Sequence, residues 1–314
     1  MNIMLEFRNF SKTYKGGKRA VDGLSLHVEA GDIYGFIGHN GAGKTTSLRA
    51  ACGILDFTEG DILIGGISVK KDPVAVKRMT AYIPDNPDIY EFMTGIAYLN
   101  FIADVYGVSA EERKARIEKY AGMFEISADL GAPVCSYSHG MRQKLAIIAA
   151  LVHSPKLLIL DEPTAVLTPQ ETTTLFDLLR QLTAEGLTVI FITHKLGEVM
   201  DICDECTVLR QGRVAAANLP ISEIHSHEQL AELMVGRSID LVTRKKEAVP
   251  GGAVLDVRGL CYTDKEEVPR LSDMSFQVHA GEIVGVAGVD GNGQSELVRC
   301  IIGLLRPQSG SILL

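Results

Sequence analysis

Residues 38–45 constrain the fold more than any other part of the sequence, because they fit the pattern G-x-x-x-x-G-K-[S/T]. They follow an apolar run, residues 33–37, that predicts a strand, and they precede a predicted helix over residues 45–52. A glycine-rich loop in this setting wraps phosphates with its backbone N–H groups and the helix N-terminus. We therefore predict an α/β fold with a phosphate-binding loop made of Gly38, His39, Asn40, Gly41, Ala42, Gly43, Lys44, Thr45 and Thr46.

Two acids downstream complete a predicted catalytic site. The apolar run 157–160 ends abruptly in Asp161 and Glu162, which delivers both carboxylates to the sheet edge where a phosphate loop lies. Lys44 is expected to contact the β- and γ-phosphate oxygens of a nucleotide, and the Thr45 hydroxyl to hold Mg²⁺. Asp161 suits the Mg²⁺ shell and Glu162 the polarisation of the attacking water. The alternative is a plain strand end.

The rest of the first 236 residues supports this fold class. Residues 24–28 alternate apolar and polar side chains, and a helical stretch is predicted over residues 95–122. Short apolar runs at 157–160 and 189–192 alternate with helical patterns. This order is typical of a parallel sheet covered on both faces.

Composition excludes several classes of protein. A net charge of −8 argues against a nucleic-acid partner, because neutralising phosphates needs a basic surface. No stretch approaches the roughly 18 apolar residues of a membrane span, and no signal peptide opens the chain, so we expect a soluble protein. Six scattered cysteines suit a reducing cytosol. The pair Cys203 and Cys206 lacks a second pair at zinc-site spacing, and we expect it within a helix.

The chain repeats its own beginning. Residues 5–8 and 60–63 recur, with similar residues, as 255–258 and 310–313, each 250 positions later. We predict a first domain over residues 1–236 with a helical subdomain at about 86–155, a linker over 237–253 and a second domain from 254 to 314. Only the first part of the second copy is present, so we expect a fragment.

The second copy carries a degenerate phosphate loop. Its residues are Gly288, Gly291, Gly293, Gln294 and Ser295, and Gln294 stands where the first copy has Lys44. Losing the lysine removes the charge that steadies a developing negative γ-phosphate. We expect this loop to bind nucleotide and to hydrolyse it poorly.

On these motifs the chain resembles ABC transporter ATPases over nearly its whole length. The resemblance implies a P-loop ABC ATPase cassette, with a parallel sheet core, an antiparallel β subdomain and a helical subdomain, followed by the truncated start of a second cassette. Tyr14 stands where the family stacks an aromatic ring on adenine. His194 matches the switch histidine that contacts the γ-phosphate. Cofactors would be ATP and Mg²⁺.

The family signature L-S-G-G-Q matches residues 137–141 only in part. Ser138 and Gly140 are kept, whereas His139 and Met141 replace a glycine and the glutamine. The resemblance implies that this segment contacts a nucleotide held by a partner cassette, and a helix N-cap at Ser138 is a compatible interpretation. Asp85 stands where the family has a glutamine that touches Mg²⁺ and relays to the membrane domain. A metal-side role for Asp85 and a plain loop acid are the two interpretations.

The two halves of the chain resemble different groups of ABC transporter ATPases. Residues 1 to about 155, with the segments 82–85 and 138–141, resemble single-cassette ATPases that partner export-type permeases. Residues from about 160 onward resemble tandem-cassette ATPases that import sugars or nucleosides, on the segments 161–170, 192–195 and 235–237 and on the repeat. A chimera and a divergent subfamily are the two hypotheses. We favour the ATPase of an importer, over that of an exporter or a soluble ABC ATPase outside transport. Expected partners are permease subunits, a second cassette from the missing part or another chain, and a substrate-binding protein. We expect the chain at the cytoplasmic face of the membrane.

Overall fold

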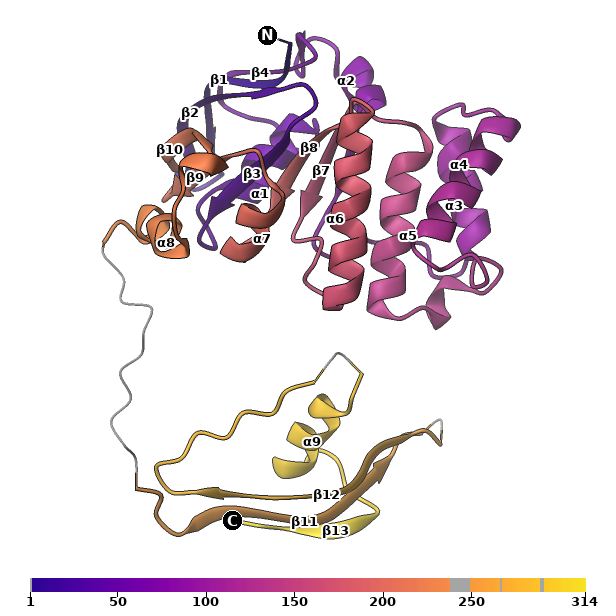
Figure 1. Ribbon diagram of the computed structural model, residues 1–314, viewed down its shortest axis with the longest axis vertical. Helices are drawn as coiled ribbons and strands as arrows, with labels where there is room; N and C mark the ends of the chain where they lie inside the picture. Colours follow the sequence, from indigo (N-terminus) through magenta and orange to yellow (C-terminus); the bar gives the residue numbers. More distant parts are fainter. Residues whose placement is uncertain (1, 238–248, 266, 289–290) are drawn as a thin grey trace. The chain divides into compact units, whose positions relative to one another are not determined.

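The computed structural model describes residues 2–237, 249–265, 267–288 and 291–314 (Figure 1). The chain divides into two compact units, residues 1–239 and 240–314. Most of the predicted linker, residues 238–248, lies outside the described residues, as do positions 289 and 290 of the second loop. No helix in the described ranges has both the length and the hydropathy that a membrane span requires.

An antiparallel sheet opens the first unit. Its strand order is β2-β1-β4-β5, with β1 at Ile3–Thr13, β2 at Arg19–Glu29, β4 at Glu59–Ile64 and β5 at Ile67–Ser68. The predicted alternation on β2 is confirmed, because Leu24, Leu26 and Val28 are buried while Ser25 and His27 are exposed. One face of this sheet therefore belongs to the core.

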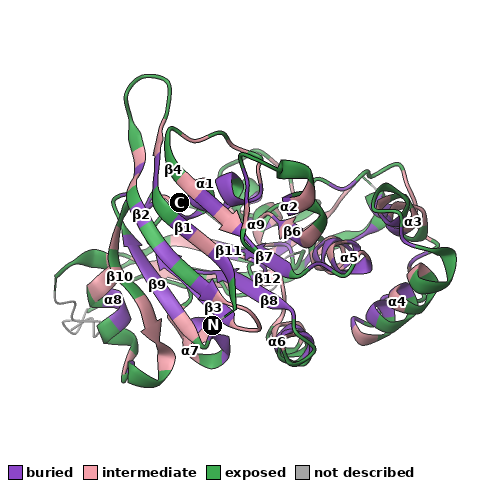
Figure 2. Ribbon diagram, turned by 90° about the horizontal axis from the view of Figure 1, so that it is seen from above, coloured by how far each residue is buried: buried purple, intermediate pink, exposed green. Residues whose placement is uncertain are grey.

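The second sheet forms the centre of the unit. Its order is β10-β9-β3-β8-β7-β6, and all neighbours pair in parallel except β9 and β10. The strands are β3 (Ile33–Gly38), β6 (Thr80–Ile83), β7 (Leu157–Asp161), β8 (Thr188–Ile192), β9 (Glu205–Arg210) and β10 (Arg213–Pro220). Every residue of β3, β7 and β8 is buried (Figure 2). The predicted α/β fold with a parallel core is thus confirmed.

Helices account for the remaining layer. They are α1 (Lys44–Ala51), α2 (Pro73–Met79), α3 (Gly95–Val105), α4 (Ala110–Met123), α5 (His139–Val152), α6 (Pro169–Ala184), α7 (Leu196–Ile202) and α8 (His227–Val235). The stretch predicted as helical over 95–122 is two helices, because the chain turns between Tyr106 and Ser109 and Ser109 caps α4. Both α3 and α4 pack against α5.

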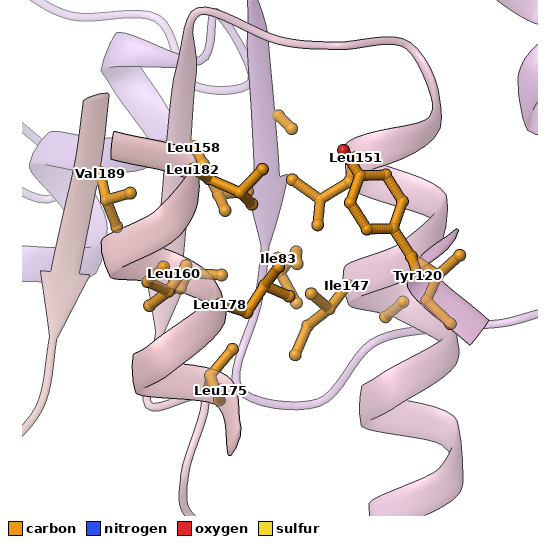
Figure 3. Packing of buried hydrophobic residues seen from close by; sticks show 14 of the residues in the cluster. Ile83, Tyr120, Ile147, Leu151, Leu158, Leu160, Leu175, Leu178, Leu182 and Val189 are labelled. Atoms are coloured by element: carbon orange, nitrogen blue, oxygen red, sulfur yellow. The ribbon is translucent and has the colours of Figure 1, made fainter. Parts of the chain in front are cut away.

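Strand β7 contributes to two cores at once. Leu158 and Leu160 belong to the cluster under α5 and α6, whereas Leu157 and Ile159 belong to the cluster under the antiparallel sheet. Figure 3 shows the first cluster, in which sheet residues such as Leu160 face Leu178 of α6. Because successive side chains of a strand point to opposite faces, both faces of the central sheet are covered and the strand ends are left for the site.

The helix expected around Cys203 and Cys206 is wrong. Helix α7 ends at Ile202, and Cys206 lies on β9. The carboxylate of Asp204 accepts the N–H of Ile33 at 2.8 Å, and its own N–H donates to the Ile33 carbonyl at 2.8 Å. These tertiary bonds turn the segment into the sheet. Both thiols are buried, which raises the pKa of Cys206 to about 12 and that of Cys203 well above its usual value.

The second unit repeats the first sheet of the first unit. Strands β11 (Ala253–Thr263), β12 (Pro269–His279) and β13 (Ser309–Leu313) have the order β12-β11-β13, and α9 spans Gln294–Ile301. Val257 pairs with Phe276 as Phe7 pairs with Leu26, so the 250-residue offset holds in the register. Residues 282–288, which correspond to β3, are exposed and take no part in a sheet among the described residues.

Candidate nucleotide-binding site

The phosphate loop joins β3 to α1, as predicted. Gly43 has φ 104° and directly precedes α1. A Cβ at this position would lie 2.8 Å from the Ala20 carbonyl oxygen and 2.9 Å from Val21 Cγ2. Only glycine satisfies both the left-handed backbone and this close approach. The loop is therefore held against the start of β2, and it lines the cavity at the N-terminus of α1, where backbone N–H groups suit a phosphate.

Lys44 lies inside the loop. Its ammonium group donates to the carbonyl oxygens of Gly38 at 2.6 Å and His39 at 3.3 Å, and its side chain is buried. Burial lowers the pKa of Lys44, while the charges of Glu162 and Asp161 oppose that change. A desolvated ammonium held beside two acids is suited to exchange these carbonyl oxygens for phosphate oxygens.

Thr45 and Asp161 form the expected metal-side pair. The Thr45 hydroxyl donates to Asp161 Oδ2 at 3.0 Å, and the Tyr82 hydroxyl approaches the same oxygen at 3.4 Å. Burial raises the pKa of Asp161, with smaller contributions in the same direction from Asp85 and Glu162. A hydroxyl and a carboxylate are hard oxygen donors, the kind that Mg²⁺ takes from a protein while keeping water and phosphate as its other ligands. The residues present therefore fit Mg²⁺.

Glu162 occupies a strained backbone position at the end of β7. Its φ of 49° is in the left-handed region, which non-glycine residues rarely adopt. The N–H of Glu162 donates to the carbonyl of Ile192 on β8 at 3.0 Å, so the turn is fixed to the neighbouring strand. His194 follows that strand, and its Nδ1 lies 2.9 Å from Glu162 Oε2. Strain of this kind is often retained where a side chain must be aimed at a site.

One cavity gathers most of the predicted residues. It measures about 610 Å³, and its lining includes Tyr14, Asp85, Asp161, Glu162 and the phosphate loop from Asn40 to Thr46. Tyr14 is partly exposed at the cavity, with its hydroxyl 3.3 Å from Thr46 Oγ1. His194 is not part of the lining, but it contacts the lining residue Glu162.

Four further lining residues were not predicted from the sequence. Lys18 comes from the β1–β2 turn, Arg19 and Ala20 from the start of β2, and Gln211 from the β9–β10 turn. The β9–β10 turn is tied to the loop because the Gly212 N–H donates to the Ala42 carbonyl at 3.1 Å. The two basic residues lie close to Tyr14 in sequence, which is a signal that could have been used. Nothing local marks Gln211.

The signature segment lies apart from this cavity. Ser138 caps α5, since the Met141 N–H donates to Ser138 Oγ at 3.2 Å, so the interpretation as an N-cap is confirmed. His139 and Gly140 form the first turn of that helix. A contact between this segment and the nucleotide of a partner cassette stays a prediction.

At Gly293 the second loop keeps a close approach seen in the first loop. A Cβ on Gly293 would lie 2.3 Å from the Arg270 carbonyl oxygen, which is the contact that Gly43 makes with Ala20. Gln294 begins α9, and its amide lies against Gly288, as Lys44 lies against Gly38. The amide carries no charge to stabilise a developing negative γ-phosphate. Poor hydrolysis at the second loop stays a prediction.

This geometry defines a P-loop nucleotide-binding domain. The sequence profile described as "ABC transporter" matches residues 21–165 and 271–314, and the chain therefore belongs to the ABC transporter family. The resemblance drawn from the motifs is thus confirmed, and ATP or ADP is the nucleotide of this family.

Relatives and solved structures agree with this assignment. The chain is 36% identical over 331 residues to the guanosine import ATP-binding protein NupO of Bacillus subtilis, covering 100% of this chain and 62% of that protein. It is 33% identical over 341 residues to the glucose import ATP-binding protein TsgD13 of Haloferax volcanii, covering 98% and 62%. The chain thus spans about three fifths of the length of these relatives.

Among solved structures, the chain is similar to an ATP binding subunit of an ABC transporter. The TM-score is 0.69 at 30% identity, with 74% of this chain and 98% of that chain covered. This similarity confirms the cassette fold.

Proposed function

We propose that the chain is the ATP-hydrolysing subunit of an ABC transporter that energises import of a sugar or nucleoside through a partner permease. The observation that carries the proposal is the Glu162–His194 pair beside Lys44 and the Thr45–Asp161 pair. Relatives of the chain are named as import ATP-binding proteins for glucose, nucleosides, guanosine and ribose.

Each residue has a chemical task in this proposal. The N–H groups of the phosphate loop and Lys44 bind the β- and γ-phosphates, and the Tyr14 ring stacks on adenine. Thr45 and Asp161 would hold Mg²⁺, which would offset the charge on the phosphate oxygens, and Asp85 lines the same cavity near enough to Asp161 to raise its pKa. Glu162 orients and polarises the attacking water, and His194 steadies the γ-phosphate.

An apolar groove beside the site supports a permease partner. It measures about 390 Å³ and runs from the end of β6 to α3 and α5, with Pro84, Tyr98 and His153 in its lining. Pro84 directly precedes Asp85, so a protein seated in the groove would touch the segment that reaches the nucleotide cavity. Phe92, in the segment between β6 and α3, is 85% exposed. Docking here would place the chain at the cytoplasmic face of the membrane. An importer would also need a substrate-binding protein to deliver the solute to its permease.

A second cassette completes the proposal. Residues 1–236 would form one cassette and residues 254–314 would repeat its first part after the 237–253 linker. In this arrangement two cassettes face each other head to tail, so that the signature at Ser138–Met141 of one meets the ATP of the other. ATP would then shift the population toward the closed pair, and hydrolysis would reopen it.

The test compares ATP hydrolysis by the full chain with that of Glu162→Gln, with size-exclusion chromatography under ATP. We expect the wild type to hydrolyse ATP, and Glu162→Gln to lose at least about 100-fold in kcat while it binds ATP and elutes as a dimer. Glu111→Gln, an exposed glutamate on α4, is the matched control and should behave as the wild type. Binding without turnover by the wild type would overturn the proposed hydrolysis.

The membrane partner can be tested separately. A neighbouring gene that encodes about six or more apolar segments, and whose product copurifies with this chain, supports transport. A charged substitution in the groove, such as Tyr98→Asp, should abolish that copurification without changing ATP binding. Copurification that survives this change would rule out the groove as the docking site.

A further inference from the structure

Glu198, in the first turn of α7, is the centre of a hydrogen-bond network next to the site. The Thr164 hydroxyl lies 2.7 and 2.8 Å from its two carboxylate oxygens, and the Thr193 hydroxyl donates to Oε2 at 3.0 Å. Lys195 Nζ lies 3.0 Å from Oε1. The side chain of Glu198 is 12% exposed, and both threonines are buried. A carboxylate this enclosed is stable only with such partners.

The direction of every hydrogen bond in this network is fixed. Each threonine hydroxyl has one proton, and both protons point to Glu198, which only accepts when ionised. The free lone pair of Thr193 Oγ1 accepts the Lys195 N–H at 3.1 Å, and that of Thr164 Oγ1 accepts from Lys195 Nζ at 3.2 Å. Lys195 Nζ also donates to the Thr164 carbonyl at 3.1 Å. A glutamine at position 198 would therefore turn its NH₂ group toward a threonine hydroxyl or the Lys195 ammonium, both of which are already donors.

The network joins the two loops that carry the reactive pair. Thr164 lies two residues after Glu162, and Thr193 and Lys195 flank His194. The hydrogen bond from the Glu162 N–H to the Ile192 carbonyl also links these two loops. The side chain of His194 is 62% exposed, and the contact that the structure gives it is the one to Glu162. The orientation of the His194 ring therefore depends on the backbone of residues 193–195. Glu198 fixes this backbone through its contacts with the side chains of Thr193 and Lys195.

We propose that Glu198 is a positioning residue for ATP hydrolysis, which keeps the His194 ring facing Glu162 by tying residues 193–195 to Thr164. The proposal rests on the hydrolytic role proposed for the Glu162–His194 pair. Glu198 would act through His194 and would not touch ATP, because it is absent from the lining of the cavity. Loss of the tie should therefore slow the chemical step and leave the affinity for ATP nearly unchanged.

The first test compares Glu198→Gln with Asp201→Asn, an exposed acid on the same helix, in the full chain. We expect Glu198→Gln to lower kcat about 10- to 100-fold, as a misplaced catalytic group does, with KM for ATP within about twofold. Glu198→Asp, which restores an acceptor-only group, should recover part of the loss. Asp201→Asn should match the wild type. An unchanged kcat in Glu198→Gln, or a loss that appears only in KM, would overturn the proposal.

A double variant tests the route through His194. If Glu198 acts by aiming that ring, Glu198→Gln combined with His194→Ala should be no slower than His194→Ala alone. If the two losses multiply instead, Glu198 acts by another route and the proposal fails.

A spectroscopic readout keeps the test independent of turnover. With ¹³C-labelled histidine, the ring resonance of His194 is identified as the one missing from His194→Ala. It should move in Glu198→Gln and in Thr193→Val, a milder variant that serves if Glu198→Gln does not fold, and it should stay in Asp201→Asn. A His194 resonance that stays in place in the folded variants would overturn the positioning role. If this resonance moves as expected but the wild type hydrolyses no ATP, the proposed function fails while the tie between the loops stands.

Discussion

His194 Nδ1 lies 2.9 Å from Glu162 Oε2, although the two residues follow different strands. Strands β7 and β8 are parallel neighbours with Asp161 opposite Ile192. The ends of both strands therefore lie at one edge of the sheet, and the left-handed backbone of Glu162 turns its carboxylate toward the next strand.

This pairing predicts the behaviour of His194→Ala. We expect kcat for ATP hydrolysis to fall about 100-fold, the usual cost of losing one group that stabilises a developing charge, while ATP binding stays within about threefold. Steady-state hydrolysis and titration with a fluorescent ATP analogue would measure the two quantities. His27→Ala, on the exposed face of β2, is the control. Wild-type turnover in His194→Ala would contradict the role of the pair.

Tyr14 should contribute through its ring rather than its hydroxyl. The hydroxyl makes one long contact, 3.3 Å to Thr46, at a partly exposed site. We expect Tyr14→Ala to weaken ATP binding by about 1 kcal/mol, the size of one stacking contact, and Tyr14→Phe to bind as the wild type. Calorimetry with ATP would measure both. Equal losses in the two variants would mean that the hydroxyl, not stacking, is what matters.

Asp85 should raise the affinity for Mg²⁺ of the site with ATP bound. It lines the cavity on the side of Asp161 and contributes to the raised pKa of that residue. Replacing it with Asn removes a negative charge, so we expect the Mg²⁺ concentration for half-maximal hydrolysis to rise about tenfold, as for lost outer partners of a metal site. Asp88→Asn, which leaves the cavity unchanged, is the control. An unchanged Mg²⁺ requirement would favour the interpretation of Asp85 as a plain loop acid.

Ser138 can be tested for two roles with two substitutions. Ser138→Ala removes the cap of α5 and should cost about 1 kcal/mol of stability. Ser138→Asp is also a good cap, so it should unfold near the wild-type temperature. If the hydroxyl faces the phosphate of a partner cassette, the added negative charge should prevent the ATP-dependent dimer of Ser138→Asp. A normal dimer in that variant would leave capping as its whole role.

Local patterns predicted the elements that carry the chemistry. The glycine loop needs a strand before it and a helix after it, and both occur, as β3 and α1. The acids at 161 and 162 lie where the apolar run ends, because the end of a buried strand is where polar side chains become possible. These features depend on neighbours in sequence, which is why the sequence reveals them.

Features set by distant contacts could not be predicted. Gln211 reaches the cavity because the Gly212 N–H binds the phosphate loop at Ala42. The helix expected near Cys203 fails because Asp204 bonds to the start of β3. Both features depend on a hydrogen bond between segments that are far apart in the sequence. The periodicity of the surrounding residues does not predict such a bond.

Stability should depend on pH through Asp32. Burial, then the charges of Asp204, Glu205 and Glu29, raise the pKa of Asp32 from 3.8 to about 6. The folded chain thus keeps a proton that the unfolded chain releases between these values, so the contribution is complete below pH 3.8 and is lost as the pH rises through about 6. Asp32→Asn should therefore raise stability at pH 7 by about 1 kcal/mol, after allowance for solvent screening.

Calorimetry of the first unit would check this as a rise in Tm of about 3 °C at pH 7. At pH 3.5 the variant and the wild type should unfold together. A rise of the same size at both pH values would show that the carboxylate charge is not the cause.

The exposed segment 282–288 has a consequence for handling the protein. Its counterpart β3 is fully buried, whereas Ile283 is 87% exposed and Val286 54%. A β-prone apolar run at the surface can add to a strand of another molecule. Aggregation in concentrated preparations should therefore begin in this second unit. The substitution Ile283→Lys would place a charge in the segment and should reduce that aggregation.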